Sequence, residues 1–258
     1  MVRAFPDPRN QILLAEAPRQ IPLGEARNRA CGLARGEYLA FLDSDDLWLP
    51  EKTTRQLEKF RACPDFGMVF SETYFFDGKK VLKHYRVKVP EGMIFGELLK
   101  NYCISMETVM IRADVFRRMP EPFDPELHVA EEKDLFLRIA EKHPVGCVRA
   151  PLAYWRVHSE SETHKNFHRF SRENLKIIRK LNSINPHLRR QYPEAYQVQK
   201  VKILWQDALS RWQKGHTHEA RVRLVKLWRS GWKYRGAWGL TFLGVPGYRL
   251  ALWLQHVL

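Results

Sequence analysis

Hydrophobic positions divide the chain into a part that mixes strands with helices and a part that is helical throughout. Residues 38–42 and 67–71 are apolar runs without alternation, which is typical of strands buried on both faces of a parallel sheet. Four further segments have the apolar spacing of amphipathic helices: residues 23–35, 51–60, 95–101 and 130–142. We therefore predict an α/β domain with a mostly parallel sheet, in which residues 38–42 and 67–71 are neighbouring central strands.

Turn residues and further apolar runs complete this domain. Residues 107–112 and 152–157 are predicted strands, and Asp77-Gly78 separates residues 73–76 from 80–85 in a pattern typical of a β-hairpin. The strand at residues 152–157 is the last one that the sequence predicts.

Only helical patterns remain after residue 164. The clearest is residues 194–214, where one apolar stripe is formed by Val198, Val201, Trp205, Ala208 and Trp212. We therefore divide the chain into residues 1–164, an α/β domain, and residues 165–258, an all-helical basic region.

Charge is distributed unevenly between these two parts. The chain has 258 residues and a net charge of +14. Residues 165–258 contain 19 Lys and Arg against 4 Asp and Glu, a net charge of +15, whereas the first 164 residues have a net charge of −1. A cationic region of this kind suits anionic lipid headgroups or nucleic acid.

Tryptophans in the helical region distinguish between these two partners. Trp205 and Trp212 lie on the apolar stripe, where they should pack inward rather than stack on bases, so nucleic acid is disfavoured. Four more tryptophans accompany Lys and Arg near the C-terminus: Trp228, Trp232, Trp238 and Trp253. We predict a peripheral protein on the cytoplasmic face of the membrane. The alternative is a helical cap that packs on the first domain with its charges solvated.

Secretion and membrane crossing are not expected. Residues 1–8 lack the apolar segment of a signal peptide, and no stretch reaches the roughly 18 uncharged apolar residues that a membrane span needs. The four cysteines are far apart and have no C-x-x-C spacing: Cys31, Cys63, Cys103 and Cys147. We therefore expect reduced thiols in a cytoplasmic protein.

An acidic cluster directly follows the apolar run at residues 38–42. Asp43, Asp45 and Asp46 fall within four positions, and carboxylates this close repel one another unless a cation lies among them. Mg²⁺ and Mn²⁺ commonly bridge such carboxylates to a diphosphate, and ligands of α/β sheets bind beyond the carboxyl ends of strands. The alternative is a solvated turn that caps the helix beginning near Pro50.

The acidic cluster belongs to a series of short sequence motifs that follow one another along the chain. They are GEARN at residues 24–28, ARGEYLAFLDSDDLW at 34–48 with PEK at 50–52, EEKDLFLR at 131–138 and YWRVH at 154–158. Together they resemble the signature of family-2 glycosyltransferases, inverting enzymes of the GT-A fold that use nucleotide-diphospho-sugars. The resemblance implies a hexosyltransferase-type transfer, with inversion, to a hydroxyl of a glycan or lipid-linked acceptor in cell-surface polysaccharide biosynthesis.

The resemblance also implies roles for individual residues. Asp43 and Asp45 match the D-x-D pair that binds a divalent cation, Mg²⁺ or Mn²⁺, together with the donor diphosphate. Arg27 matches an arginine near the donor nucleotide; the alternative is an exposed helix charge. Arg156 and His158 alternate with apolar residues and so share one strand face. The resemblance places Arg156 near the diphosphate and makes His158 a metal ligand, although a lone strand histidine is more often structural.

The motifs offer two candidates for the general base. Glu132 stands where the family usually has an Asp, so its side chain is one methylene longer, and Asp134 is a rival. The alternative is that these acids only favour the first turn of a helix through its dipole.

The beginning of the chain departs from the family pattern. Family members normally open with a strand, a turn, a helix and a second strand that ends in acidic residues, and nothing before residue 24 matches this segment. The expectation is either a natural start upstream or a domain that has lost donor binding. In the second case the protein is a catalytically deficient binding module that acts through its basic region at a membrane surface.

Overall fold

The computed structural model describes residues 13, 17, 19–158 and 166–257, which fall into two compact units. The first unit contains the described residues of Met1–Ile94 and Cys103–Val157. The second contains Phe95–Tyr102 and the described residues of His158–Leu258. The predicted boundary at residue 164 lies outside the described residues.

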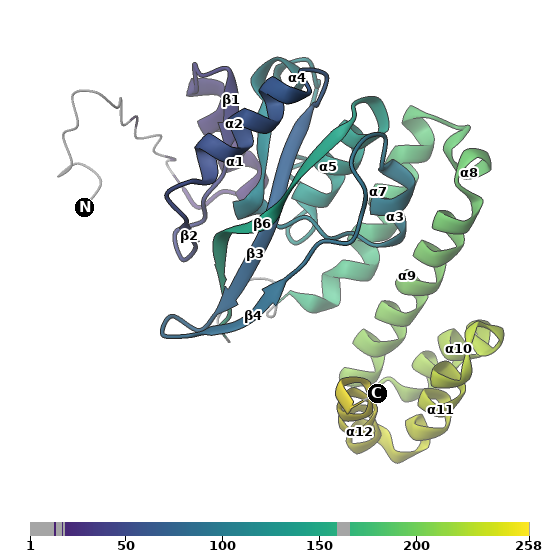
Figure 1. The fold of residues 1–258 in the computed structure, drawn as a ribbon. Helices are drawn as coiled ribbons and strands as arrows, with labels where there is room; N and C mark the ends of the chain where they lie inside the picture. The colour runs from purple at the N-terminus through teal and green to yellow at the C-terminus, as the bar shows by residue number, and fades with distance from the viewer. Residues whose placement is uncertain (1–12, 14–16, 18, 159–165, 258) are drawn as a thin grey trace. The chain divides into compact units, whose positions relative to one another are not determined.

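A mixed sheet forms the centre of the first unit. Its strands are β1 (Tyr38–Ala40), β2 (Leu47–Trp48), β3 (Met68–Phe76), β4 (Val81–Tyr85), β5 (Met110–Arg112) and β6 (Val145–Arg156). The order is β1-β5-β3-β6-β2, and β4 pairs with the far half of β3 as a hairpin. Figure 1 shows the two long strands, β3 and β6, side by side along the middle of the sheet.

Strand direction and strand order correct two predictions. Among the described strands only β3 and β6 run parallel, and the other four pairings are antiparallel, so the mostly parallel sheet is wrong. Residues 38–42 and 67–71 are not neighbours either, because β5 lies between β1 and β3. A local apolar run reports burial on both faces of a strand but carries no information on the direction or identity of its partner.

Helices cover this sheet, and all but the shortest lie at positions that the sequence indicates. They are α1 (Leu23–Leu33), α2 (Lys52–Ala62), α4 (Ala113–Arg117) and α5 (Glu131–Lys142), and a 3₁₀ turn, Met106–Thr108, precedes β5. Phe60 of α2 packs with Val69 of β3, Met110 of β5 and Leu152 of β6 in one apolar cluster. The α/β class is therefore confirmed.

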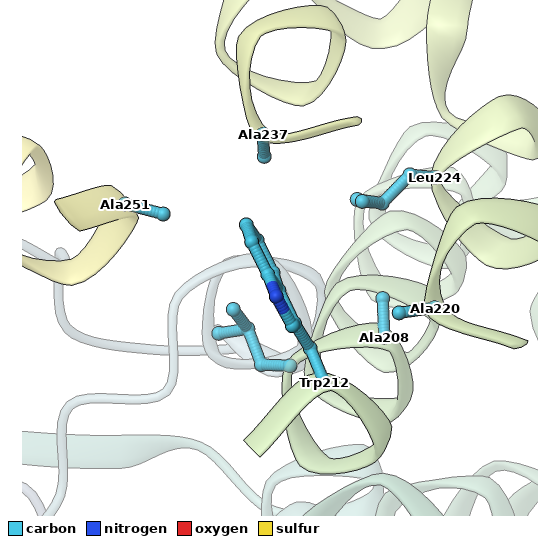
Figure 2. Close-up of a cluster of buried hydrophobic side chains, with 7 residues drawn as sticks. Ala208, Trp212, Ala220, Leu224, Ala237 and Ala251 are labelled. Carbon is cyan, nitrogen blue, oxygen red and sulfur yellow. The ribbon is translucent and has the colours of Figure 1, made fainter. Parts of the chain in front are cut away.

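The second unit is helical in its described residues. It contains α3 (Phe95–Lys100), α7 (Phe170–Ile184), α8 (Leu188–Gln191), α9 (Pro193–Gln213), α10 (Thr217–Lys226), α11 (Trp232–Leu240) and α12 (Gly244–Val257), with 3₁₀ turns at Trp228–Ser230 and Thr241–Leu243. Trp212 is fully buried at its centre and donates a 2.7 Å hydrogen bond from Nε1 to the Gly244 carbonyl. Figure 2 shows Ala208, Ala220, Leu224, Ala237 and Ala251 around the indole ring.

Two further expectations concern membrane spans and thiols. Within residues 19–158 and 166–257, no helix combines the length and the apolar character that a bilayer crossing needs. The four cysteines are free thiols, and Cys31 and Cys147 are buried.

Candidate active site

The acidic cluster forms a tight turn between β1 and β2. The Asp46 amide donates to the Asp43 carbonyl at 3.1 Å, which closes the turn. Asp46 is buried, and its Oδ1 accepts a 2.9 Å hydrogen bond from the backbone amide of Arg156 at the end of β6. Arg156 returns to the turn through Nε, which donates to the Asp45 carbonyl at 2.8 Å. The end of β6 therefore fixes the conformation of the acidic turn.

Burial gives Asp46 an unusual proton affinity. Loss of hydration, together with the charges of Asp45 and Asp43, raises the pKa of Asp46 to about 7 despite the hydrogen bond from the Arg156 amide. A cation that binds among the carboxylates of this turn would therefore stabilise their charged forms.

Arg27 of α1 joins this turn to the start of α5. Its guanidinium donates to both carboxylate oxygens of Asp43, at 2.9 and 3.1 Å, and to Oε1 of Glu131 at 2.7 Å. Arg27 is buried, so the alternative of an exposed helix charge is wrong. Its bridge brings together residues from three segments that are far apart in the sequence.

Neighbouring contacts explain why α1 lies where Arg27 can reach both acids. The Asn28 side chain donates to the Phe123 carbonyl at 2.7 Å and accepts from the Phe123 amide at 3.0 Å. Gly24 also allows a close approach, because a Cβ there would lie 3.3 Å from the Asp124 carbonyl oxygen. The segment before α5 is thereby held against α1.

Glu132 lies in the first turn of α5, next to Glu131. Loss of hydration raises the pKa of Glu132, and repulsion by the Glu131 carboxylate raises it further. The positive charge of Arg27 offsets part of this rise. Asp43 also acts on Glu132 electrostatically, so the structure brings the candidate base and the acidic turn close to one another.

Asp134 has a different environment. Its side chain has no exposed surface, and its Oδ2 accepts hydrogen bonds from Arg138 Nε at 3.0 Å and Nη2 at 2.7 Å. A carboxylate that is buried and ion-paired in this way is suited to holding α5 together rather than to meeting an acceptor hydroxyl.

Arg156 and His158 belong to different units. The Arg156 guanidinium lies 4.6 Å from the centre of the Phe76 ring, beside the β3–β4 turn, and it remains at the acidic turn. His158 falls in the second unit, so its role as a metal ligand stays a prediction.

Sequence reasoning missed two buried ionisable residues close to the acidic turn, Lys52 and Glu107. Lys52 is 1% exposed, and its Nζ lies 2.6 Å from Gln56 Oε1 and 4.5 Å from the centre of the Trp48 ring. Glu107 is 2% exposed, and its carbonyl accepts a 2.9 Å hydrogen bond from Trp48 Nε1. Burial lowers the pKa of Lys52 to about 7 and raises that of Glu107 to about 8. Lys52 belongs to the PEK motif, but Lys and Glu are rarely buried, so the sequence did not indicate that Lys52 and Glu107 would be buried.

Asp43 and Asp45 are the side chains that suit a divalent cation. In the described part of the chain, no three His, Cys, Asp or Glu side chains converge as a complete metal site. Mg²⁺ does not require one, because it is commonly held by one or two carboxylates together with substrate phosphates and water. The Asp43 side chain keeps 40% of its surface exposed beside its contact with Arg27, and Asp45 is partly exposed. These residues therefore fit a cation that arrives with a diphosphate.

The buried Arg27, the acidic turn and Glu132 with its raised pKa lie close together in the first unit. Comparison with known proteins gives the family. Residues 1–197 match the model described as "Glycosyltransferase like family 2", and the chain belongs to this family. The resemblance seen in the motifs is therefore confirmed.

Individual relatives cover this chain only in part. An uncharacterized glycosyltransferase of Methanocaldococcus jannaschii is 26% identical over 61% of this chain and 54% of its own. The UDP-Glc:α-D-GlcNAc-diphosphoundecaprenol β-1,3-glucosyltransferase WfaP of Escherichia coli is 28% identical over 57% of each. The chain thus spans about half the length of these relatives. Among solved structures, S. aureus TarS in complex with UDP covers 82% of this chain and 72% of its own, with 18% identity and a TM-score of 0.45.

Proposed function

We propose that this protein transfers a sugar from a nucleotide-diphospho-sugar to a hydroxyl group, with inversion at the anomeric carbon. Family membership supports the reaction class. The observation that carries the proposal is the Arg27 bridge, which holds Asp43 of the acidic turn and Glu131 beside the candidate base at one place. An inverting transfer needs these two groups close together, because the base and the leaving group act on the same sugar.

Glu132 is proposed as the general base. Its raised pKa brings its proton affinity nearer to neutral pH, where a carboxylate takes a proton from a hydroxyl most effectively. The acceptor oxygen attacks the anomeric carbon as this proton leaves, and the bond from that carbon to the diphosphate oxygen breaks. Asp134 is not used, because it is buried against Arg138.

Asp43 and Asp45 are proposed to hold Mg²⁺ or Mn²⁺, which neutralises charge on the departing diphosphate. Arg156 fixes the backbone of the turn through Asp45 and Asp46, and its cation adds positive charge at the same place. The motif resemblance places Arg27 near the donor nucleotide. In the structure its donors are used on Asp43 and Glu131, so we propose that it positions these acids.

The donor and acceptor classes rest on relatives. WfaP acts, by its description, with UDP-glucose on a sugar carried by diphosphoundecaprenol. We propose a nucleotide-activated hexose as donor and a lipid-linked sugar as acceptor for this protein, with a role in cell-surface polysaccharide biosynthesis at the cytoplasmic face of the membrane.

Binding measurements separate this function from a binding module without catalysis. Calorimetric titration with UDP and Mg²⁺ should show binding that requires the metal and is weakened by Asp45→Asn. Asp65→Asn removes an exposed carboxylate elsewhere in the same unit and should bind as the wild type does. A wild-type chain that binds no nucleoside diphosphate from a panel of UDP, GDP and TDP, with or without Mg²⁺ or Mn²⁺, would support the binding module instead.

A further inference from the structure

Helix α10 has apolar residues on two faces. Ala220 and Leu224 are fully buried in the core of the second unit. Val222 and Val225, three positions apart on another face, are 42% and 53% exposed, and Trp228 continues that face beyond the end of the helix. Among the described residues Val222 and Val225 keep about half of their surface exposed, and an exposed apolar stripe of this kind indicates a binding partner.

Ring contacts extend this stripe into a continuous surface. Trp228 meets Trp238 of α11 with ring centres 5.7 Å apart, and Trp238 meets Phe242 with ring centres 5.1 Å apart. Phe242 is 64% exposed and its neighbour Leu243 is 58% exposed. We call these residues the aromatic face: Val222, Val225, Trp228, Trp238, Phe242 and Leu243.

Arginines lie directly on the aromatic face. Arg221 Cζ is 4.4 Å from the centre of the Phe242 ring. Arg235 Cζ is 5.7 Å from the centre of the Trp228 ring, and its Nε donates to the Trp228 carbonyl at 2.9 Å. Residues 214–258 contain eight Lys and Arg and a single acid, Glu219, a net charge of +7. That acid forms an ion pair with Arg211, so the surroundings of the aromatic face are strongly cationic.

We propose that the aromatic face binds the surface of a bilayer that contains anionic phospholipid. Tryptophan and arginine prefer the headgroup region, and Leu243, Val225 and Phe242 supply the apolar surface that enters the acyl boundary. Each basic residue near an anionic leaflet adds about 1 kcal/mol of attraction. This inference goes beyond the transfer reaction, and it holds whether or not the first unit is catalytic.

Other occupants fit the aromatic face less well. A second copy would bring one cationic surface against another, which repels. A nucleic acid would stack its bases on ring faces, whereas Trp238 meets both of its neighbours edge to face, and the aliphatic residues offer nothing to a base.

Flotation of the full chain with vesicles tests the proposal. Vesicles of phosphatidylglycerol and phosphatidylcholine in equal parts should carry the protein upward, vesicles of phosphatidylcholine alone should not, and high salt should weaken binding. The Phe242→Ser/Leu243→Ser variant should partition at least about ten-fold more weakly, because it removes two exposed apolar side chains. The matched control is Val81→Ser/Leu82→Ser in the β3–β4 hairpin, where both residues are 48% exposed, and it should bind as the wild type does.

Thermal unfolding of each variant establishes that it is folded, since all four positions are exposed to solvent. The proposal is overturned if the wild-type chain stays unbound on anionic vesicles at low salt, or if Phe242→Ser/Leu243→Ser floats as the wild type does. It is also overturned if the same variant abolishes binding of a single-stranded oligonucleotide and leaves vesicle binding intact.

Discussion

Arg27→Met removes the cation that joins the acidic turn to the start of α5. The side chains of Arg27 and Glu131 are 10% and 3% exposed, so their ion pair is buried, whereas that of Asp43 is 40% exposed. Removing one partner of a buried pair costs about 3–5 kcal/mol, because the other charge loses its compensation where water cannot replace it. The partly exposed contact to Asp43 adds at most about 1 kcal/mol. We expect a loss of at least about 3 kcal/mol, which lowers the melting temperature by at least about 6–12 °C.

Thermal and urea unfolding followed by circular dichroism measure this loss, and the same helix supplies a matched control. Arg29 forms an exposed pair with Glu25 at 2.7 Å, so Arg29→Met should cost only about 0.3–0.5 kcal/mol. Adding Glu131→Gln to Arg27→Met should recover part of the stability, because the uncompensated charge is then gone. Equal losses in Arg27→Met and Arg29→Met would refute the buried bridge.

Three further predictions concern the groups around this bridge. Glu132→Gln should lower kcat for transfer by about 10²–10⁴-fold with little change in KM for the donor. The wild-type rate should rise with pH through the raised pKa of Glu132, and the variant should lose this dependence. An unchanged pH–rate profile in the variant would exclude Glu132 as the base. Gly78→Ala should reduce transfer more than Gly92→Ala in steady-state assays. Both glycines have positive φ, 94° and 104°, but only at Gly78 does a Cβ meet Arg156, 2.4 Å from Nη1. Glu107→Gln should change the pH dependence of stability in urea unfolding. Burial raises the pKa of Glu107 from 4.5 to about 8, so the folded state holds a proton that the unfolded state releases, and the wild type should lose stability relative to the variant as pH rises through that window. A stability difference that stays constant from pH 4 to pH 9 would contradict this.

The local elements could be predicted because their signals are local. Apolar spacing located α1, α2, α3 and α5 to within a few residues, and Asp77-Gly78 located the hairpin of β3 and β4. Strand order could not be predicted in this way. The β5 strand enters between β1 and β3 through pairings more than 40 residues apart, and nothing in residues 38–42 distinguishes an edge strand from a central one.

The sequence suggests which acids form the candidate site, but it does not show their burial or their ion pairs. Motif order suggested Asp43, Asp45 and Glu132, because their spacing is a property of the sequence, and their roles stay predictions. The Arg27 bridge and the burial of Asp46, Lys52 and Glu107 depend on which surfaces face one another after folding. These features set the proton affinities of the site, so its chemistry could be described only from the structure.

Transfer of a labelled sugar tests the central claim most directly. The wild-type chain and Asp45→Asn are incubated with UDP-glucose, Mg²⁺ or Mn²⁺ and a diphospho-lipid that carries N-acetylglucosamine, the acceptor type in the WfaP description. GDP- and TDP-hexoses are tested in parallel as donors. The product is identified by mass spectrometry. Our account predicts a glycosylated lipid that requires the metal, disappears in Asp45→Asn and persists in Asp65→Asn. Transfer that is equal in Asp45→Asn and the wild type, or no transfer from any of these donors, would contradict it.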